Sequence, residues 1–314
     1  MILTVTLNAA VDSTWRVDNL VVGSINRVGA EEPTRVAGGK GINVARFIHK
    51  LGERVLATGF VGGFMGELIK SQLEDEGIDF HFIPLSGESR ECLIILNSAD
   101  GTWTGIYGTG PKVPPSKLDE FKSFFADILS SCKLVCLSGS LPLGVPRDFY
   151  ADLISLSRKE DIPIILDTSG EALKEGVQAK PFMIKPNLQE FKEIFNLSRG
   201  TNSERSVEEK ANALVATGLN VVAISKGEEG SIIYSKNKSW RMIPPKIRMT
   251  NPVGAGDAFV GGFAVGIVRG QSIRDSAILG TAGGAAKAEV LRVGDITLSR
   301  VQELVKEVEC HPLT

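Results

Sequence analysis

The 314-residue chain has 43% hydrophobic and 23% charged residues, the composition of an ordinary globular protein. Its formal net charge of −2, without a basic run, argues against a nucleic-acid partner. No apolar run reaches membrane-spanning length, and residues 1–3 enter a strand pattern without a basic leader, so we expect no membrane partner and a cytoplasmic location. The 4 cysteines and 3 histidines are scattered, which disfavours a zinc set or a histidine triad.

Strand and helix patterns alternate along most of the chain. Strands are predicted at residues 2–7, 55–60, 134–138, 164–167, 182–185 and 221–225. Helices are predicted at residues 42–51, 66–76, 117–130, 147–159, 188–195 and 207–217. This alternation indicates an α/β fold with a doubly wound, mostly parallel sheet and helices on both faces, and we expect residues 1–314 to form a single domain.

Two stretches break the alternation. Residues 11–36 contain short strand-like pieces, and residues 79–108 contain extended runs in hairpin-like order. Because both stretches fall between α/β units near the N-terminal half, we expect them to form a small β-sheet over one end of the main sheet. A sheet in that place is suited to be a lid that excludes water from a reaction.

The most informative stretch is residues 250–270. It contains Gly254, Ala255 and Gly256, then Asp257 and an almost uncharged run that predicts a central, buried helix. The unpaired N–H groups of a glycine-rich helix start favour an anion, which predicts a site for a phosphoryl group in transfer. Asp257 would repel a bound phosphate but is suited to take a proton from an attacking hydroxyl; the alternative is that it only caps the helix. We expect another element to pack closely on this helix at Gly261, Gly262 and Gly266.

A second glycine-rich stretch, Gly38-Gly39-Lys40-Gly41-Ile42-Asn43, precedes a predicted helix. It is not a Walker A loop, because no Ser or Thr follows the lysine; it is predicted to bind a ligand, with a plain glycine-rich turn as the alternative. Asp12 lies just past the carboxyl end of the first strand, where doubly wound sheets bind ligands, although a turn residue is an equal interpretation.

Three further segments carry weaker signals. Asn187 and Glu190 open a predicted helix and fit a capping box, while the functional interpretation gives Glu190 to a magnesium ion that bridges phosphates. Residues 225–230 predict a tight turn between two strands. Arg27 and Arg90 lie in the two lid stretches; arginine binds phosphate with a bidentate fork, but a surface arginine usually has no specific role.

In their order along the whole chain, these segments resemble the signatures of the PfkB family of ribokinase-like carbohydrate kinases. Residues 38–43 are similar to its N-terminal signature G-G-K-G-x-N, and residues 251–259, N-P-V-G-A-G-D-A-F, to its C-terminal one. K-P-N-x-x-E at residues 185–190 resembles its magnesium motif, and S-x-G-x-x-G at residues 225–230 its nucleotide turn. L-S-G-S-L-P at residues 137–142 resembles the branch that contains 1-phosphofructokinase and tagatose-6-phosphate kinase.

The resemblance implies a ribokinase-like fold and a site that uses ATP and Mg²⁺. It implies that the catalytic base is Asp257 and that the transferring phosphoryl group is bound by Gly254, Ala255 and Gly256. It implies that the sugar is held by Asp12, Gly38, Gly39, Lys40 and Asn43, and the sugar's own phosphate by Arg27, Arg90 and Ser140. ATP would be bound by Lys185, Asn187, Ser225, Gly227 and Gly230, with Glu190 acting on magnesium. The resemblance also implies a homodimer formed through the lid.

We therefore expect ATP-dependent phosphorylation of a ketohexose monophosphate, with fructose 1-phosphate as the preferred acceptor and tagatose 6-phosphate as the alternative. One departure bears on the acceptor: Asp257-Ala258-Phe259 is closer to ribokinase than to this branch. Two other functions stay open. A kinase for a neutral sugar or nucleoside would leave Arg27 and Arg90 without a role, and a sugar-phosphate sensor that has lost catalysis would not need Asp257 and Glu190.

Overall fold

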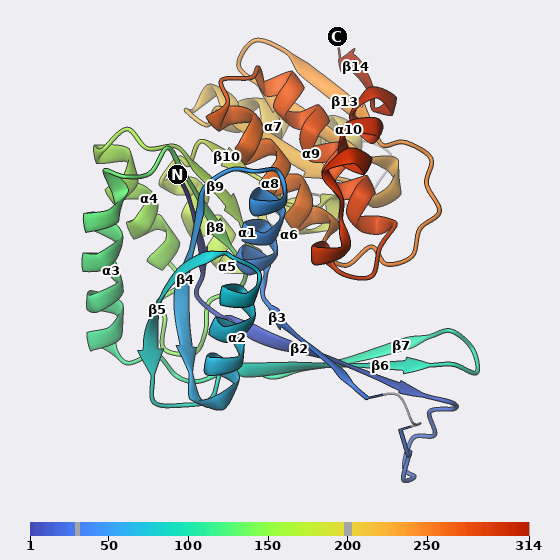
Figure 1. The fold of residues 1–314 in the computed structure, drawn as a ribbon. Helices are drawn as coiled ribbons and strands as arrows, with labels where there is room; N and C mark the ends of the chain where they lie inside the picture. The colour runs from blue at the N-terminus through green and yellow to red at the C-terminus, as the bar shows by residue number, and fades with distance from the viewer. Residues whose placement is uncertain (29–31, 198–202, 314) are drawn as a thin grey trace.

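Strands and helices alternate in the computed structural model, which describes residues 1–28, 32–197 and 203–313 (Figure 1). Residues 29–31 of the predicted lid lie outside the described residues. Within the described part, ten strands form the main sheet in the order β14 (Glu309–Leu313), β13 (Ser239–Ile243), β12 (Ser231–Ser235), β11 (Val221–Ser225), β10 (Met183–Ile184), β9 (Ile164–Asp167), β8 (Leu134–Ser138), β1 (Ile2–Thr6), β4 (Val55–Gly62) and β5 (Asp79–Leu85). The strands from β11 to β5 are parallel and β12 to β14 antiparallel, which confirms the mostly parallel sheet.

Helices cover both faces of the main sheet because side chains alternate along its strands. In β1, Ile2 belongs to one buried cluster and Leu3 to the other. The first cluster contains side chains of α1 (Lys40–Lys50), α2 (Gly63–Asp75), α8 (Ala255–Val268), α9 (Ile273–Ala288) and α10 (Leu298–Glu307). The second contains side chains of α3 (Pro115–Leu129), α4 (Phe149–Lys159), α5 (Gly170–Gln178), α6 (Leu188–Ile194) and α7 (Ser203–Ala216). Among the described helices, none is long and apolar enough to cross a membrane.

A separate small sheet extends from one end of the main body (Figure 1). Its strands are ordered β3 (Thr34–Gly38), β2 (Ala10–Val17), β6 (Arg90–Asn97) and β7 (Trp103–Tyr107). The predicted lid was too wide, because the part of residues 79–108 that forms β5 is the edge strand of the main sheet. There β5 pairs in parallel with β4 along its whole length and buries Phe82 and Ile83 on opposite faces. An edge strand and a lid strand have the same short apolar pattern, so only the pairing separates them.

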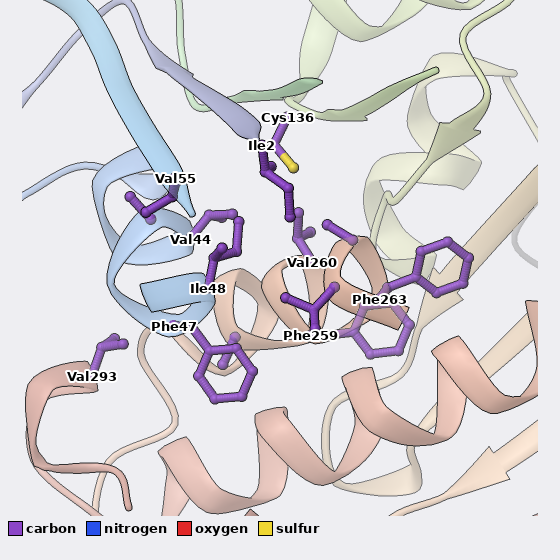
Figure 2. Close-up of a cluster of buried hydrophobic side chains, with 14 of the residues drawn as sticks. Ile2, Val44, Phe47, Ile48, Val55, Cys136, Phe259, Val260, Phe263 and Val293 are labelled. Carbon is purple, nitrogen blue, oxygen red and sulfur yellow. The ribbon is translucent and has the colours of Figure 1, made fainter. Parts of the chain in front are cut away.

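Helix α8 is the centre of one face of the core, as its apolar sequence predicted. Figure 2 shows Phe259, Val260 and Phe263 of α8 in the same buried cluster as Phe47 of α1. Close approach occurs at the three expected glycines. A methyl carbon built on Gly261 would lie 3.0 Å from Phe47 Cδ1, one on Gly262 2.8 Å from the Leu279 carbonyl oxygen, and one on Gly266 2.7 Å from Ser276 Cα. Both α1 and α9 therefore contact the backbone of α8 directly.

Gly262→Ala is expected to lower the free energy of unfolding by about 1–3 kcal/mol, because the added methyl group would meet the α9 backbone. This cost exceeds the ~1 kcal/mol that alanine gains over glycine in helix propensity. Gly294→Ala is the matched control, since no atom lies within 4 Å of a methyl carbon built there. Denaturant titration measures both variants, and equal stability would contradict the close packing of α8 on α9.

Candidate active site

A cleft of about 220 Å³ lies at the carboxyl ends of β1, β8 and β9, the edge of a doubly wound sheet that usually binds ligands. Hydroxyl, amide and charged groups line it. The lining residues are Thr6, Asn8, Lys40, Arg90, Ser138, Gly139, Ser140, Thr168, Ser169 and Glu190. Four residues singled out in separate sequence segments, Lys40, Arg90, Ser140 and Glu190, thus share one cleft.

Asp257 lies in the first turn of α8, is 6% exposed, and accepts a hydrogen bond from Asn43 Nδ2 at 2.9 Å. The helix begins at Gly254 without a side-chain capping bond, so the structure does not support the capping alternative. Burial, and then the negative charge of Asp167, raise the pKa of Asp257 to about 6, while Lys40 opposes the shift. A carboxylate whose pKa approaches neutrality is a better proton acceptor than an ordinary one, which suits a general base.

The glycine turn before α8 has the geometry of an anion site. Gly254 has a φ of 87°, in the left-handed region that favours glycine. The Ala255 N–H donates to the Pro252 carbonyl oxygen at 3.1 Å, so the turn itself uses this predicted phosphoryl donor. A methyl carbon built on Gly256 would lie 3.3 Å from Lys185 Nζ. The Lys185 ammonium therefore adds positive charge at the start of the helix, where the dipole already favours an anion.

Asp167 is a residue of this site that the sequence analysis missed. It is 1% exposed at the end of β9, and its Oδ1 accepts from Lys40 Nζ at 3.2 Å and lies 3.3 Å from Lys185 Nζ. The pKa of Lys40 is raised, chiefly by Asp167. Asp167 directly follows the apolar run of a predicted strand, as Asp12 nearly does. This position at the carboxyl end of a strand is the signal in the sequence that could have identified Asp167 as a site residue.

The opposite end of the cleft is built around Asn8, which sequence reasoning also did not assign. Asn8 Nδ2 donates to Ser140 Oγ at 3.1 Å, and Arg90 Nε donates to the Asn8 carbonyl oxygen at 3.1 Å. Asp12 packs against Gly38, where a methyl group would overlap its carboxylate. Burial raises the pKa of Asp12, and the positive charge of Arg90 opposes the shift. The Asp12 carboxylate and the Arg90 guanidinium thus lie close enough to interact.

Two other predicted sugar-binding residues lie differently. Gly39 has a φ of 106° at the start of α1, and a methyl carbon there would lie 2.7 Å from Thr6 Cγ2, so the turn packs on β1. Arg27 is exposed in the connection between β2 and β3. The structure does not bring Arg27 to the cleft lining described above.

Asn187 and Glu190 form the capping box that was the alternative to a metal role. Asn187 Oδ1 accepts from the Glu190 N–H, and Glu190 Oε2 accepts from the Asn187 N–H, each at 2.8 Å. Glu190 also lines the cleft, and the buried Asp167 Oδ2 has no hydrogen-bond partner. No group of three metal-ligating side chains occurs among the described residues. Two carboxylates with free oxygens fit magnesium, which usually keeps waters and binds substrate phosphates.

The predicted ATP-binding turn borders a second, larger pocket of about 850 Å³. Asn187, Ser225 and Gly227 line it, between α6 and the end of β11. Gly230 has a φ of 88°, and a methyl group there would overlap the Met242 carbonyl oxygen, so glycine is required by the turn. The tight turn predicted at residues 225–230 is confirmed.

A doubly wound sheet, a buried carboxylate at a glycine-rich helix start and a polar cleft are the features expected of a small-molecule phosphotransferase. A family model described as pfkB family carbohydrate kinase matches residues 5–299. The chain belongs to this family, and the ribokinase-like fold expected for it is confirmed. It is therefore a kinase that transfers a phosphoryl group to an alcohol of a carbohydrate.

Similar proteins align along almost the whole chain. Tagatose-6-phosphate kinase from Staphylococcus epidermidis is 34% identical over 311 residues, which covers 98% of this chain and 99% of the relative. Phosphofructokinase-2 from Escherichia coli, solved with fructose-6-phosphate, is 27% identical with a TM-score of 0.88, covering 97% of this chain and 98% of the other. A possible 1-phosphofructokinase from Thermotoga maritima is 25% identical with a TM-score of 0.89 and covers 100% of both chains.

Asp257→Asn is expected to lower kcat by about 10²–10⁴-fold while ligand binding is kept, because only the proton acceptor is lost. Wild-type kcat/KM should also fall about tenfold per pH unit below a pKa near 6, since a protonated carboxyl group in the free enzyme cannot accept a proton. Steady-state kinetics measured from about two pH units below that pKa to about two above it test both points. A near-normal rate for Asp257→Asn would disprove the assignment of the base.

The same pKa shift predicts a stability difference. The folded chain holds the Asp257 proton more tightly than the unfolded chain, where the carboxyl group has the ordinary pKa of 3.8, so wild-type stability should fall as pH rises from 3.8 to about 6. Asp257→Asn lacks this titration and should gain stability relative to the wild type over that interval. Thermal unfolding at several pH values measures the gain.

Proposed function

We propose that the chain is an ATP- and magnesium-dependent kinase for a ketohexose monophosphate. The observation that carries the proposal is the arrangement of charge along one cleft. Arg90, beside Asn8 and Ser140, supplies a cationic end suited to a phosphate already on the sugar. Lys40 connects this end to the region of Asp257, where a hydroxyl can be deprotonated.

In the proposed reaction, the acceptor hydroxyl donates a hydrogen bond to Asp257, which takes the proton as the oxygen attacks the γ-phosphorus of ATP. The bond from that phosphorus to the β–γ bridging oxygen breaks, and ADP leaves. The N–H groups of Gly254 and Gly256 and the ammonium groups of Lys40 and Lys185 offset the charge on the phosphoryl oxygens. Positioning and electrostatic stabilisation account for most of the acceleration in such chemistry.

Glu190 and Asp167 are the residues that would hold magnesium, because each has a carboxylate oxygen free to bind. When bound, magnesium supplies positive charge to the phosphates of ATP. ATP itself would lie between the glycine turn and the larger pocket, along Asn187, Ser225 and Gly227. ATP and sugar phosphates are found in the cytoplasm, where we propose that the enzyme works.

Two acceptors have specific support. Fructose 1-phosphate was predicted from the sequence, and a possible 1-phosphofructokinase shares the fold over its full length. Tagatose 6-phosphate is the acceptor named by the curated relative at 34% identity, a higher identity than that of the solved structures. We therefore rank tagatose 6-phosphate first and fructose 1-phosphate second. Release of ADP from MgATP with each of these, fructose 6-phosphate and free fructose tests the ranking.

We also propose that the small sheet is a lid and that two copies pair through it. Strand β7 exposes 58% of Trp103, 58% of Ile106 and 57% of Tyr107, an unusual concentration of large apolar side chains. We propose a second copy of this chain as the partner that covers the β7 surface, because a two-fold axis places the same apolar patch of each copy against the other. Pairing would also give Arg27, which lies outside its own cleft, access to a phosphate in the other copy.

Arg90→Ala is expected to raise KM for the sugar phosphate by about 10–100-fold, because a charge-assisted hydrogen bond to phosphate is lost. Activity on an unphosphorylated ketose should fall much less, because Arg90 affects that acceptor only through its contacts with Asn8 and Asp12. Arg35→Ala is the matched control, since Arg35 lies on β3 of the same small sheet with a half-exposed side chain. An equal loss on both kinds of acceptor would argue against phosphate binding by Arg90, and activity on free fructose alone would indicate a neutral-sugar kinase.

Trp103→Glu is expected to weaken the dimer by about 30-fold or more in Kd, as loss of an aromatic anchor does at an interface centre. Leu298→Glu, which changes a 43%-exposed apolar residue on α10, is the control. Analytical ultracentrifugation over a concentration series measures both. A wild-type chain that stays monomeric at every concentration would rule out the proposed pairing.

A further inference from the structure

Lys287 is a buried charge with no place in the reaction described above. It lies in the last turn of α9 and is only 2% exposed. Its Nζ donates to three backbone carbonyl oxygens: Asn251 at 3.2 Å, Val290 at 3.1 Å and Leu291 at 3.2 Å. An ammonium group has three donors, so each is matched by one acceptor. The three backbone oxygens thus form a complete site for a cation, and the cation that occupies it is the Lys287 ammonium group.

The three carbonyl groups come from two segments that this ammonium joins. Val290 and Leu291 follow the end of α9, whereas Asn251 opens the turn that leads to Gly254. Asn251 makes two more bonds across the same junction: its N–H donates to the Ala288 carbonyl oxygen at 3.1 Å, and its Nδ2 to the Leu291 carbonyl oxygen at 3.0 Å. A buried cation is therefore part of the attachment of the glycine turn to α9.

The lysine stem passes directly behind the glycine turn. A methyl carbon built on Gly254 would lie 3.5 Å from Lys287 Cε. Burial lowers the pKa of Lys287 to about 8, and the carboxylates of Asp295, on the 3₁₀ turn η2 (Val293–Asp295), and Asp257, on α8, oppose the shift. Three carbonyl oxygens and two carboxylates thus favour the charged form of Lys287 against the cost of desolvation.

We propose that Lys287 is a positioning residue for phosphoryl transfer: its ammonium holds the Asn251 carbonyl oxygen and so sets the position of the Gly254–Gly256 backbone relative to Asp257. The inference rests on the proposed function, because it concerns the turn to which that function assigns the phosphoryl group. Lys287 itself touches neither substrate. Its effect should appear in kcat, since a misplaced turn impairs the transition state more than it impairs ground-state binding of the sugar.

Two substitutions separate the effect of the Lys287 charge from the effect of its aliphatic stem. Lys287→Ala removes both and leaves room for a small cation between the carbonyl oxygens. Lys287→Met removes the charge but keeps a chain of similar length, which fills that room. A purely structural lysine would lower thermal stability in both variants without a response of kcat to any added cation.

The experiment measures kcat, KM for the sugar phosphate and Tm of the wild type and both variants in MgATP. Ammonium chloride is exchanged for choline chloride at constant ionic strength, because ammonium has the charge and donors of the lost group and choline is too large to enter. We expect kcat of Lys287→Ala to fall by about 10–100-fold with little change in KM, as the loss of hydrogen bonds to a charged group predicts. Ammonium should restore much of this loss in Lys287→Ala alone and should not affect the wild type.

Three results would overturn the inference. One is an unchanged kcat in Lys287→Ala. Another is a loss of kcat that ammonium fails to restore in a variant whose Tm shows that it is folded. The third is a chain that is unfolded with either substitution in both salts, which would make Lys287 a structural residue. A wild type without kinase activity on any sugar would refute the proposed function instead, so the two failures are distinguishable.

Discussion

A helix without a polar face must be surrounded by protein, and this constraint governs the whole site. Helix α8 buries ten of its residues, from Asp257 to Gly266, against α1 and α9. Its N-terminus nevertheless carries a carboxylate and the unpaired N–H groups that every helix start leaves over. Lys40, which lines the cleft at the carboxyl ends of the strands, lies close enough to this end of the helix for its charge to act on Asp257. The glycines that allow dense packing therefore also hold the polar end of the helix near the cleft.

Buried charge is the second feature that follows from this arrangement. Asp167 and Asp257 lie within a region of low dielectric, and Lys40 and Lys185 both lie against Asp167. Buried ion pairs contribute little net stability, because desolvation offsets their attraction. Their concentration at one edge of the sheet is better explained by chemistry than by folding. Lys185 shows the link most directly, since one ammonium touches both the Asp167 carboxylate and the start of α8.

The sequence predicted those parts of the fold in which local pattern and tertiary role agree. Strands β8, β9 and β11 were predicted to the residue, because a buried parallel strand is a continuous apolar run with sharp ends. Helix α5 was missed, since at 9 residues it is short for a helical period to be recognised in the sequence. The predicted bounds of the lid were wrong, because the sequence of a single strand does not show which other strand it pairs with.

The same distinction separates the site residues that could be predicted from those that could not. Asp257 stands in a segment whose local sequence already predicts an anion site, so a role for it could be proposed from the sequence. Asp167 accepts a hydrogen bond from Lys40, 127 positions away, and Asn8 donates one to Ser140, 132 positions away, so these partners are far apart in the sequence. The capping box at Glu190 is the opposite case. Its local sequence pattern predicted a helix-capping role, and the structure shows that role. Side chains that act through long-range contacts are those that a single sequence leaves unassigned.

The site is divided between two bodies, and this division bears on how the reaction is controlled. Asp12 and Arg90 lie on β2 and β6 of the small sheet, where Ala10 pairs with Arg90, whereas Asp257 and the glycine turn belong to the main body. The proposed sugar-binding end and the proposed phosphoryl end are therefore not fixed to one rigid element. A ligand that touches both ends links the two sheets, so binding energy from the non-reacting end of the sugar can be used to align its hydroxyl with the base. Truncating the sugar should then cost turnover as well as affinity, because the link between the two bodies is lost with it.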